Sequence, residues 1–201
     1  MLSAVSVRTF NAPEYNKKEI LRYALVESAT DEISGLLEDC IAELDGKLCY
    51  KVCFCECDVT RDVSGLDLSF AHTDSTALAK NLDGCDRIVL FGATVGLGID
   101  RLVAKYARVS PSRALMLQAI GAERIESLCD AFERSLLKDM SKDGVALRPR
   151  FSPGYGDLPI ELQRDVFRVL DAPKKIGLTL TESLLMSPTK SVTAIIGLEK
   201  A

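Results

Sequence analysis

One short segment of this chain, residues 150–159 (Arg-Phe-Ser-Pro-Gly-Tyr-Gly-Asp-Leu-Pro), carries side chains well suited to binding a small molecule. Pro153 fixes its own φ angle at about −65° and disfavours helix at the residue before it, so the segment interrupts any preceding helix. The two glycines accept positive φ and have no Cβ, which allows a ligand to approach the main chain. Arg150 offers paired donors to a carboxylate, and Tyr155 offers a ring face to a cation or a flat heterocycle. On composition alone, an ordinary surface turn with a solvated arginine is the favoured interpretation.

Two carboxylates, Glu126 and Asp130, stand four residues apart in a long segment with helical periodicity. Residues at this spacing share one face of a helix. A solvated acidic face is the default interpretation. The alternative is that both side chains point into a cleft and meet a cation on a ligand.

Four cysteines stand close together in a β-rich segment: Cys49, Cys53, Cys55 and Cys57. On a strand they share one face at steps of about 6.6–7 Å, too widely spaced to close on one tetrahedral ion. No Cys-x-x-Cys pair is present. We therefore predict that these side chains pack as small buried hydrophobes and that the chain holds no metal.

Two further patterns fit nucleotide binding or catalysis poorly. Glycines at positions 92, 96 and 98 lie between an expected strand and an expected helix, but their spacing is not Gly-x-Gly-x-x-Gly and no Lys-Ser/Thr follows. A tight strand-to-helix connection lining a pocket wall is the better prediction. His72 stands near Asp74, where the two could form an acid–base pair, but no nucleophile motif accompanies them. The sequence predicts no catalytic residue.

The bulk composition is that of a globular protein with one domain spanning residues 1–201: 47% of residues are hydrophobic and 27% are charged. The net charge is −4 and no basic stripe is present, which argues against nucleic acid or an anionic membrane as partner. No apolar run approaches about 20 residues, so we expect neither a membrane span nor a signal peptide. We expect a cytoplasmic protein whose seven cysteines are reduced thiols.

The order of the expected elements indicates the fold class. Apolar spacing predicts helices over residues 16–24, 30–45, 75–81, 99–106, 112–140, 160–170 and 172–176, with Gly121 weakening the longest. Strands are predicted over residues 48–59, 66–72, 87–91, from Leu178 to a turn at Pro188, and over 191–196. The first two are expected to form a hairpin around residues 60–65. Strands and helices do not alternate strictly, which favours an α+β fold with a largely antiparallel sheet over a doubly wound one.

Two motifs, in this order, resemble the activation (reactivation) domain of cobalamin-dependent methionine synthases. The first is Arg150-x-x-Pro153-Gly154-Tyr155, similar to the family's Arg-x-x-Pro-Gly-Tyr loop. The second is Leu-Thr-Glu-Ser-x-x-Met-x-Pro-x-x-Ser-Val over residues 180–192. The likeness is clearest over residues 112–198, and the chain resembles the stand-alone clostridial-type version of this domain.

The resemblance implies a C-shaped α+β fold with a twisted antiparallel sheet and flanking helices. It implies an accessory domain that binds S-adenosylmethionine and donates its methyl group to cobalamin during reductive reactivation of cob(II)alamin. The cobalamin is carried by a methionine synthase module or another corrinoid protein, and a flavodoxin-like protein supplies the electron. Because cob(I)alamin is a strong nucleophile and a sulfonium is a good leaving group, such a domain needs only to bind and orient the donor.

The resemblance also assigns roles to residues. Arg150 would hold the carboxylate of S-adenosylmethionine, and the turn formed by Pro153, Gly154 and Tyr155 would offer backbone groups and a ring. Glu126 or Asp130 would face the amino group or the sulfonium.

The chain departs from the family pattern at two places. Gly156-Asp157 replaces the more usual residues after the tyrosine, and Ile195-Ile196-Gly197 stands where aromatic residues follow Ser-Val in large methionine synthases. Two alternative functions therefore stay open. One is a corrinoid-protein docking module that does not bind S-adenosylmethionine, and the other is an independent methyltransferase with a different acceptor.

Overall fold

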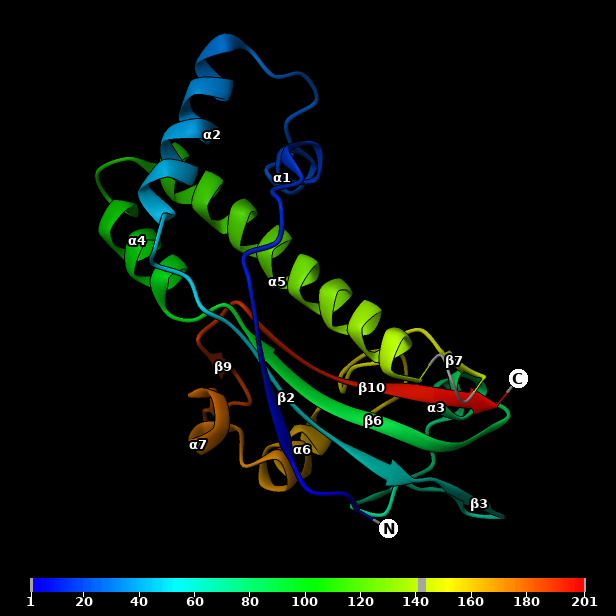
Figure 1. The fold of residues 1–201 in the computed structure, drawn as a ribbon. Coiled ribbons are helices and arrows are strands. Elements are labelled where there is room, and N and C mark those ends of the chain that lie inside the picture. The colour runs from blue at the N-terminus through cyan, green and yellow to red at the C-terminus, as the bar shows by residue number, and fades with distance from the viewer. Residues whose placement is uncertain (1, 141–143, 201) are drawn as a thin grey trace.

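The structure, a computed structural model, describes residues 2–140 and 144–200. Its centre is a curled five-stranded sheet with strand order β1-β2-β6-β10-β7 (Figure 1). These strands are β1 Ser6–Phe10, β2 Tyr50–Asp58, β6 Cys85–Thr94, β10 Ser191–Lys200 and β7 Val145–Leu147. Every neighbouring pair is antiparallel. The predicted α+β class with a twisted antiparallel sheet is confirmed.

A single 30-residue helix, α5 (Pro111–Met140), lies across one face of the sheet. It begins at a proline, whose missing N–H costs nothing in the first turn of a helix. Its apolar residues recur at helical spacing and face the strands. Phe132 lies at the centre of this contact, with its ring centroid 6.5, 5.1 and 5.0 Å from the rings of Phe10, Phe54 and Phe91.

The opposite face of the sheet is covered by α3 (Thr76–Asn81), α6 (Gln163–Leu170) and α7 (Ala172–Ile176). Cys53, Cys55 and Cys57 project from β2 into this layer and are at most 1% exposed. Burial raises the pKa of the Cys53 thiol to about 11, so it stays protonated at neutral pH. The predicted packing as small buried hydrophobes is confirmed for these three cysteines, whereas Cys49 lies just before β2 and is only half-buried.

Three further helices form a lobe around the N-terminal half of α5: α1 (Lys17–Tyr23), α2 (Asp31–Leu44) and α4 (Gly98–Tyr106). The chain reaches α1 from the edge strand β1 through residues 11–16, here called the N-terminal connector. This connector crosses α5 between the sheet and the lobe (Figure 1).

The predicted hairpin between residues 48–59 and 66–72 is wrong in its pairing. β2 pairs with β1 and β6 in the main sheet, partners that lie far from it along the chain. The hairpin that forms is shorter, between β3 (Thr60–Asp62) and β4 (Gly65–Asp67), and β5 (His72–Thr73) joins it. Two short elements complete the fold: the ribbon of β8 (Thr179–Leu180) with β9 (Met186–Ser187), and the 3-10 helix η2 (Ile160–Leu162).

Two glycines have roles that the sequence did not predict. Gly92 belongs to β6 rather than to the loop after it, and its Cα is paired with those of Cys53 and Thr193. Gly121 does not interrupt α5. The stem of Lys190 crosses the helix there, and a Cβ at Gly121 would lie 2.8 Å from its Cγ and Cε. The absence of a side chain at Gly121 therefore allows Lys190 to pack closely against α5.

We predict that Phe132→Ala removes the centre of the contact between α5 and the sheet. A buried phenylalanine replaced by alanine loses its transfer free energy and leaves a cavity, together about 3–5 kcal/mol. Urea unfolding measures this loss, with Val109→Ala as control because Val109 is 76% exposed. A loss for Phe132→Ala as small as that of the control would contradict this packing.

Candidate functional site

The segment that carries the first motif is attached to the sheet at its beginning and closes into a turn. Phe151 and Ile195 exchange two backbone hydrogen bonds of 2.8 Å, which connect the segment to β10. The turn is closed by the amide of Gly154, which donates to the carbonyl of Leu158 over 2.9 Å. Gly154 has φ +88°, in the left-handed region that favours glycine. Tyr155 stands at the tip of the turn, 69% exposed, with its ring edge-on to Phe151 at 5.4 Å.

Arg150 lies against the polar face of α5, where it meets three carboxylates. Its Nη1 donates to Asp130 Oδ1 over 2.9 Å and to Glu133 Oε1 over 2.6 Å. Its Nη2 donates to Glu126 Oε2 over 2.6 Å. The structure thus brings Arg150, Glu126 and Asp130 together, and the cation that the two acids meet is Arg150 itself. Glu133 was not predicted as a site residue. It stands seven residues after Glu126 on the same helix face, and this spacing could have indicated it.

This cluster carries an excess of negative charge. Burial alone would lower the pKa of Arg150, but hydrogen bonds to Glu133, Glu126 and Asp130 outweigh burial and raise it. The guanidinium therefore stays charged. Three carboxylates against one guanidinium leave a formal charge of −2. A ligand with a net positive charge complements this arrangement.

Two hollows lie side by side along α5, as shown by Glu126, which lines both. One, of about 360 Å³, is lined by Glu126, Arg150, Ser152, Tyr155 and Val192. The other, of about 260 Å³, lies between α1 and α5 and is lined by Asn16, Glu19, Tyr23, Glu123, Glu126, Ser127 and Asp130. We call the two together the acidic cleft. Val192 belongs to the second motif, so both sequence motifs contribute to its walls.

The polar residues of the second motif stabilise their own segment. Thr181 Oγ1 lies 3.0 Å from Ser183 Oγ and accepts from the amide of Leu185 over 3.0 Å. Ser191 Oγ donates to the carbonyl of Pro188 over 2.8 Å. These bonds shape the turn that leads into β10 and thereby place Val192.

The pairing of His72 with Asp74 is not found. His72 Nε2 lies 3.0 Å from Ser64 Oγ, which donates to Asp62 Oδ1 over 2.6 Å, in the exposed small sheet. Within the described ranges, no group of three or more His, Cys, Asp or Glu side chains is arranged to hold a metal ion.

A buried ion pair, which the sequence reasoning missed, supports the wall of the acidic cleft. Arg124 and Glu123 are 0% and 1% exposed, and Arg124 Nε donates to Glu123 Oε2 over 2.6 Å. Arg124 also donates to the carbonyls of Pro13 and Glu14 over 2.5 and 2.7 Å, and its guanidinium carbon lies 3.9 Å from the ring centroid of Tyr15. The pair thus holds the N-terminal connector on α5 and sets the position of α1. The sequence feature that could have indicated this pair is the occurrence of two adjacent, oppositely charged residues in an amphipathic helix.

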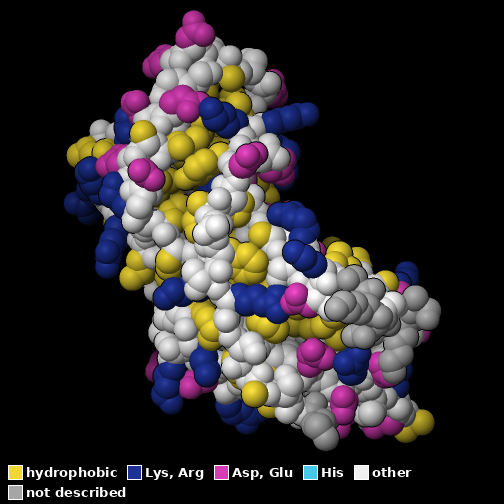
Figure 2. Space-filling view, in the orientation of Figure 1, with side chains coloured by type: hydrophobic (Ala, Val, Ile, Leu, Met, Phe, Trp, Pro, Cys, Tyr) yellow, Lys and Arg dark blue, Asp and Glu magenta, His cyan; other side chains and the backbone are white. Residues whose placement is uncertain are grey.

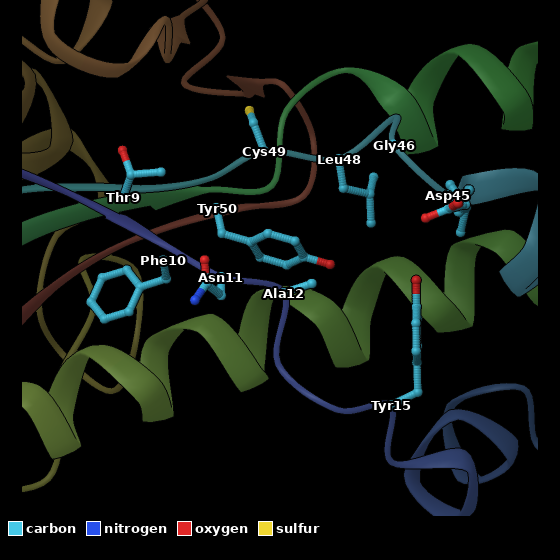
Figure 3. Close-up of a pocket in the computed structure, with 11 residues that line it drawn as sticks. Thr9, Phe10, Asn11, Ala12, Tyr15, Asp45, Gly46, Leu48, Cys49 and Tyr50 are labelled. Atoms are coloured by element: carbon cyan, nitrogen blue, oxygen red, sulfur yellow. The ribbon is translucent and has the colours of Figure 1, made fainter.

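A further hollow, of about 460 Å³, lies on the other side of the N-terminal connector (Figure 3). Tyr50 points from β2 toward Tyr15 across it, and Asp45 and Leu48 come from the segment between α2 and β2. Figure 2 shows apolar side chains gathered above it, between α1 and α2. None of the residues predicted to bind a ligand lines this hollow.

Comparison with known proteins identifies the family. The family model described as "Vitamin B12 dependent methionine synthase, activation domain" matches residues 69–201. The chain belongs to this family. No curated protein matches the sequence. Among solved structures, this activation domain is similar to one titled "Crystal Structure of the MetH Reactivation Domain bound to AdoHcy", with a TM-score of 0.67, 18% sequence identity, and coverage of 96% of this chain and 78% of that chain.

The two comparisons together confirm the resemblance and the fold. At 18% identity the structural likeness shows a shared fold, and because it covers 96% of this chain it includes α1 and α2, which precede the family match. Among the described residues, no helix combines the length and the apolar character needed to cross a lipid bilayer.

We predict that the two neighbouring acids Glu123 and Glu126 differ sharply in their contribution to stability. Glu123→Gln leaves the Arg124 charge buried without its counter-ion, which costs about 3–5 kcal/mol. The side chain of Glu126 is 42% exposed, so Glu126→Gln changes the free energy of unfolding by about 0.5 kcal/mol or less. Chemical denaturation of both variants measures the difference. Equal losses would show that Glu123 does not anchor the N-terminal connector.

Proposed function

We propose that this activation domain binds S-adenosylmethionine in the acidic cleft and presents its methyl group to cobalamin carried by a partner protein, in the reductive reactivation of cob(II)alamin. The observation that carries the proposal is that Arg150, bonded to three carboxylates, lines one hollow together with Glu126 and Tyr155. The proposed setting is the cytoplasm. The partner is a methionine synthase module or another corrinoid protein, with a flavodoxin-like electron donor.

The charges of the donor complement those of the cleft. S-adenosylmethionine carries a carboxylate, an ammonium and a sulfonium, so its net charge is positive. The ligand carboxylate replaces either Glu126 or Asp130 as a hydrogen-bond acceptor of Arg150. The ligand ammonium then pairs with the acid that was displaced. Arg150, the displaced acid, and the carboxylate and ammonium of the ligand all keep a partner during this exchange, which avoids the cost of leaving a desolvated charge alone.

The turn at Tyr155 supplies the remaining contacts. The amides of Gly154 and Tyr155 already donate within the turn. The backbone groups left for a ligand are therefore carbonyls, and among the described residues those of Pro153 and Gly154 accept no hydrogen bond. The carbonyl of the exposed Gly154 is suited to the exocyclic amine of the adenine, and the exposed ring of Tyr155 is suited to stacking, whereas Pro153 is buried and shapes the turn. This refines the sequence expectation, in which the turn offered unspecified backbone groups.

The chemistry itself requires little of this chain. Reduced cobalamin on the partner supplies the nucleophile that accepts the methyl group. The residues of the cleft bind the donor and hold its sulfonium at the exposed mouth beside Tyr155. We propose no stand-alone catalysis, because orientation is the whole contribution required of the cleft.

We predict that titration with S-adenosylmethionine in a calorimeter gives saturable binding. Arg150→Ala weakens it at least about tenfold, the effect of losing one charge-assisted contact worth about 1.5–3 kcal/mol. Arg168→Ala is the matched control, because Arg168 is an exposed arginine on α6. Absence of heat at millimolar ligand would contradict the proposal.

A corrinoid-docking module without a ligand site is the second candidate. The observation that favours it is that Arg150 is already satisfied by three acids, so the cleft is stable without a ligand. Capture of a corrinoid protein by a chain that shows no affinity for S-adenosylmethionine would support this candidate over the first.

A further inference from the structure

The carboxylate of Asp157 connects the turn of the first motif to the first residues of α3. Its Oδ2 accepts from the amide and the hydroxyl of Thr76 over 2.8 and 2.7 Å. Its Oδ1 accepts from the amide of Ala77 over 3.2 Å and from the hydroxyl of Ser75. Hydrogen bonds from Ser75, then Thr76, hold the pKa of Asp157 below its usual range. The carboxylate therefore stays ionised near neutral pH.

The helix to which Asp157 is bound is itself held firmly. Ser75 Oγ caps α3 by accepting from the amide of Leu78 over 3.1 Å. Leu78 is fully buried in the layer beneath the sheet. A side chain bonded to the beginning of α3 is thus fixed to the core of the domain.

Asp157 is coupled to Tyr155 through the turn that contains both. The amide of Leu158 donates to the carbonyl of Tyr155 over 3.1 Å, and the carbonyl of Leu158 accepts from Gly154 over 2.9 Å. Asp157 lies inside this hydrogen-bonded unit, so it cannot move without moving Tyr155. The bonds between Phe151 and Ile195 fix only the other end of the segment.

Gly156 allows the close approach that these bonds need. It has φ +59°, and a Cβ there would lie 3.2 Å from Cβ of Ala77 on α3. Gly156 and Asp157 are the pair at which the sequence departs from the usual family loop. In the structure, both residues of that pair contact α3.

We propose that Asp157 is the positioning residue of the ligand loop: by binding the first residues of α3, it holds Tyr155 at the mouth of the acidic cleft. Asp157 does not touch the ligand. The inference rests on the proposed function for its effect on affinity, but the position of the loop is testable without any ligand.

The ligand-free test uses Tyr155→Trp in the full chain, where this tryptophan is unique because the sequence contains none. With Asp157 intact, we expect the indole to be restrained and its fluorescence anisotropy high. Adding Asp157→Ala lowers the anisotropy while the far-ultraviolet circular dichroism stays unchanged. Adding Asp157→Asn, which keeps one acceptor oxygen, gives an intermediate value. Equal anisotropy in all three proteins would overturn the proposal.

The second test measures affinity for S-adenosylmethionine by calorimetry at a temperature where all variants are folded. Asp157→Ala is expected to weaken binding at least tenfold, and Asp74→Asn, an exposed acid just before α3, to leave it within twofold. Thr76→Val weakens binding less and adds nothing to Asp157→Ala, because both changes remove the same contact. Unchanged affinity in Asp157→Ala would refute the positioning role. Absence of binding by the wild type would instead refute the proposed function, and the anisotropy test would then decide the role of Asp157.

Discussion

The contact between α5 and the curled sheet, centred on Phe132, is the constraint on which the rest of the structure depends. One face of the helix is buried against the strands, so its rotation about its own axis is fixed. That rotation turns Glu126, Asp130 and Glu133 toward the segment that leaves β7. The N-terminal half of the same helix carries the lobe. A single packed interface thus sets the position of both walls of the acidic cleft.

The charges around this helix form two groups with different tasks. The pair of Arg124 and Glu123 is fully buried and holds the N-terminal connector, so its partners are fixed. The cluster around Arg150 is half exposed and has more acids than it needs to neutralise one guanidinium. Its bonds are therefore exchangeable, which is what a site for a zwitterionic cation requires. The buried pair provides a rigid wall, and the exposed cluster provides the groups that we propose bind the ligand.

The sequence was informative where local periodicity determines structure. It predicted α5, the helices beneath the sheet, the packed cysteines of β2 and the two motifs that meet at the cleft. It missed the strands β1 and β7, which lie at the sheet edges and have mixed composition, so their pairing comes from the tertiary fold. It mispaired β2 because strand neighbours depend on contacts distant in sequence. The partners of Arg150 and Asp157 lie 17 to 82 residues away, beyond the reach of spacing arguments.

We propose that the acidic cleft exchanges its internal ion pairs for those of an amino-acid ligand. A crystal structure of the protein with S-adenosylmethionine tests this most directly. We predict the ligand carboxylate within hydrogen-bond distance of Arg150, the ammonium on Glu126 or Asp130, and the sulfonium beside Tyr155. A ligand bound instead between Tyr15 and Tyr50, or an Arg150 that keeps all three of its acids in the complex, would contradict the account.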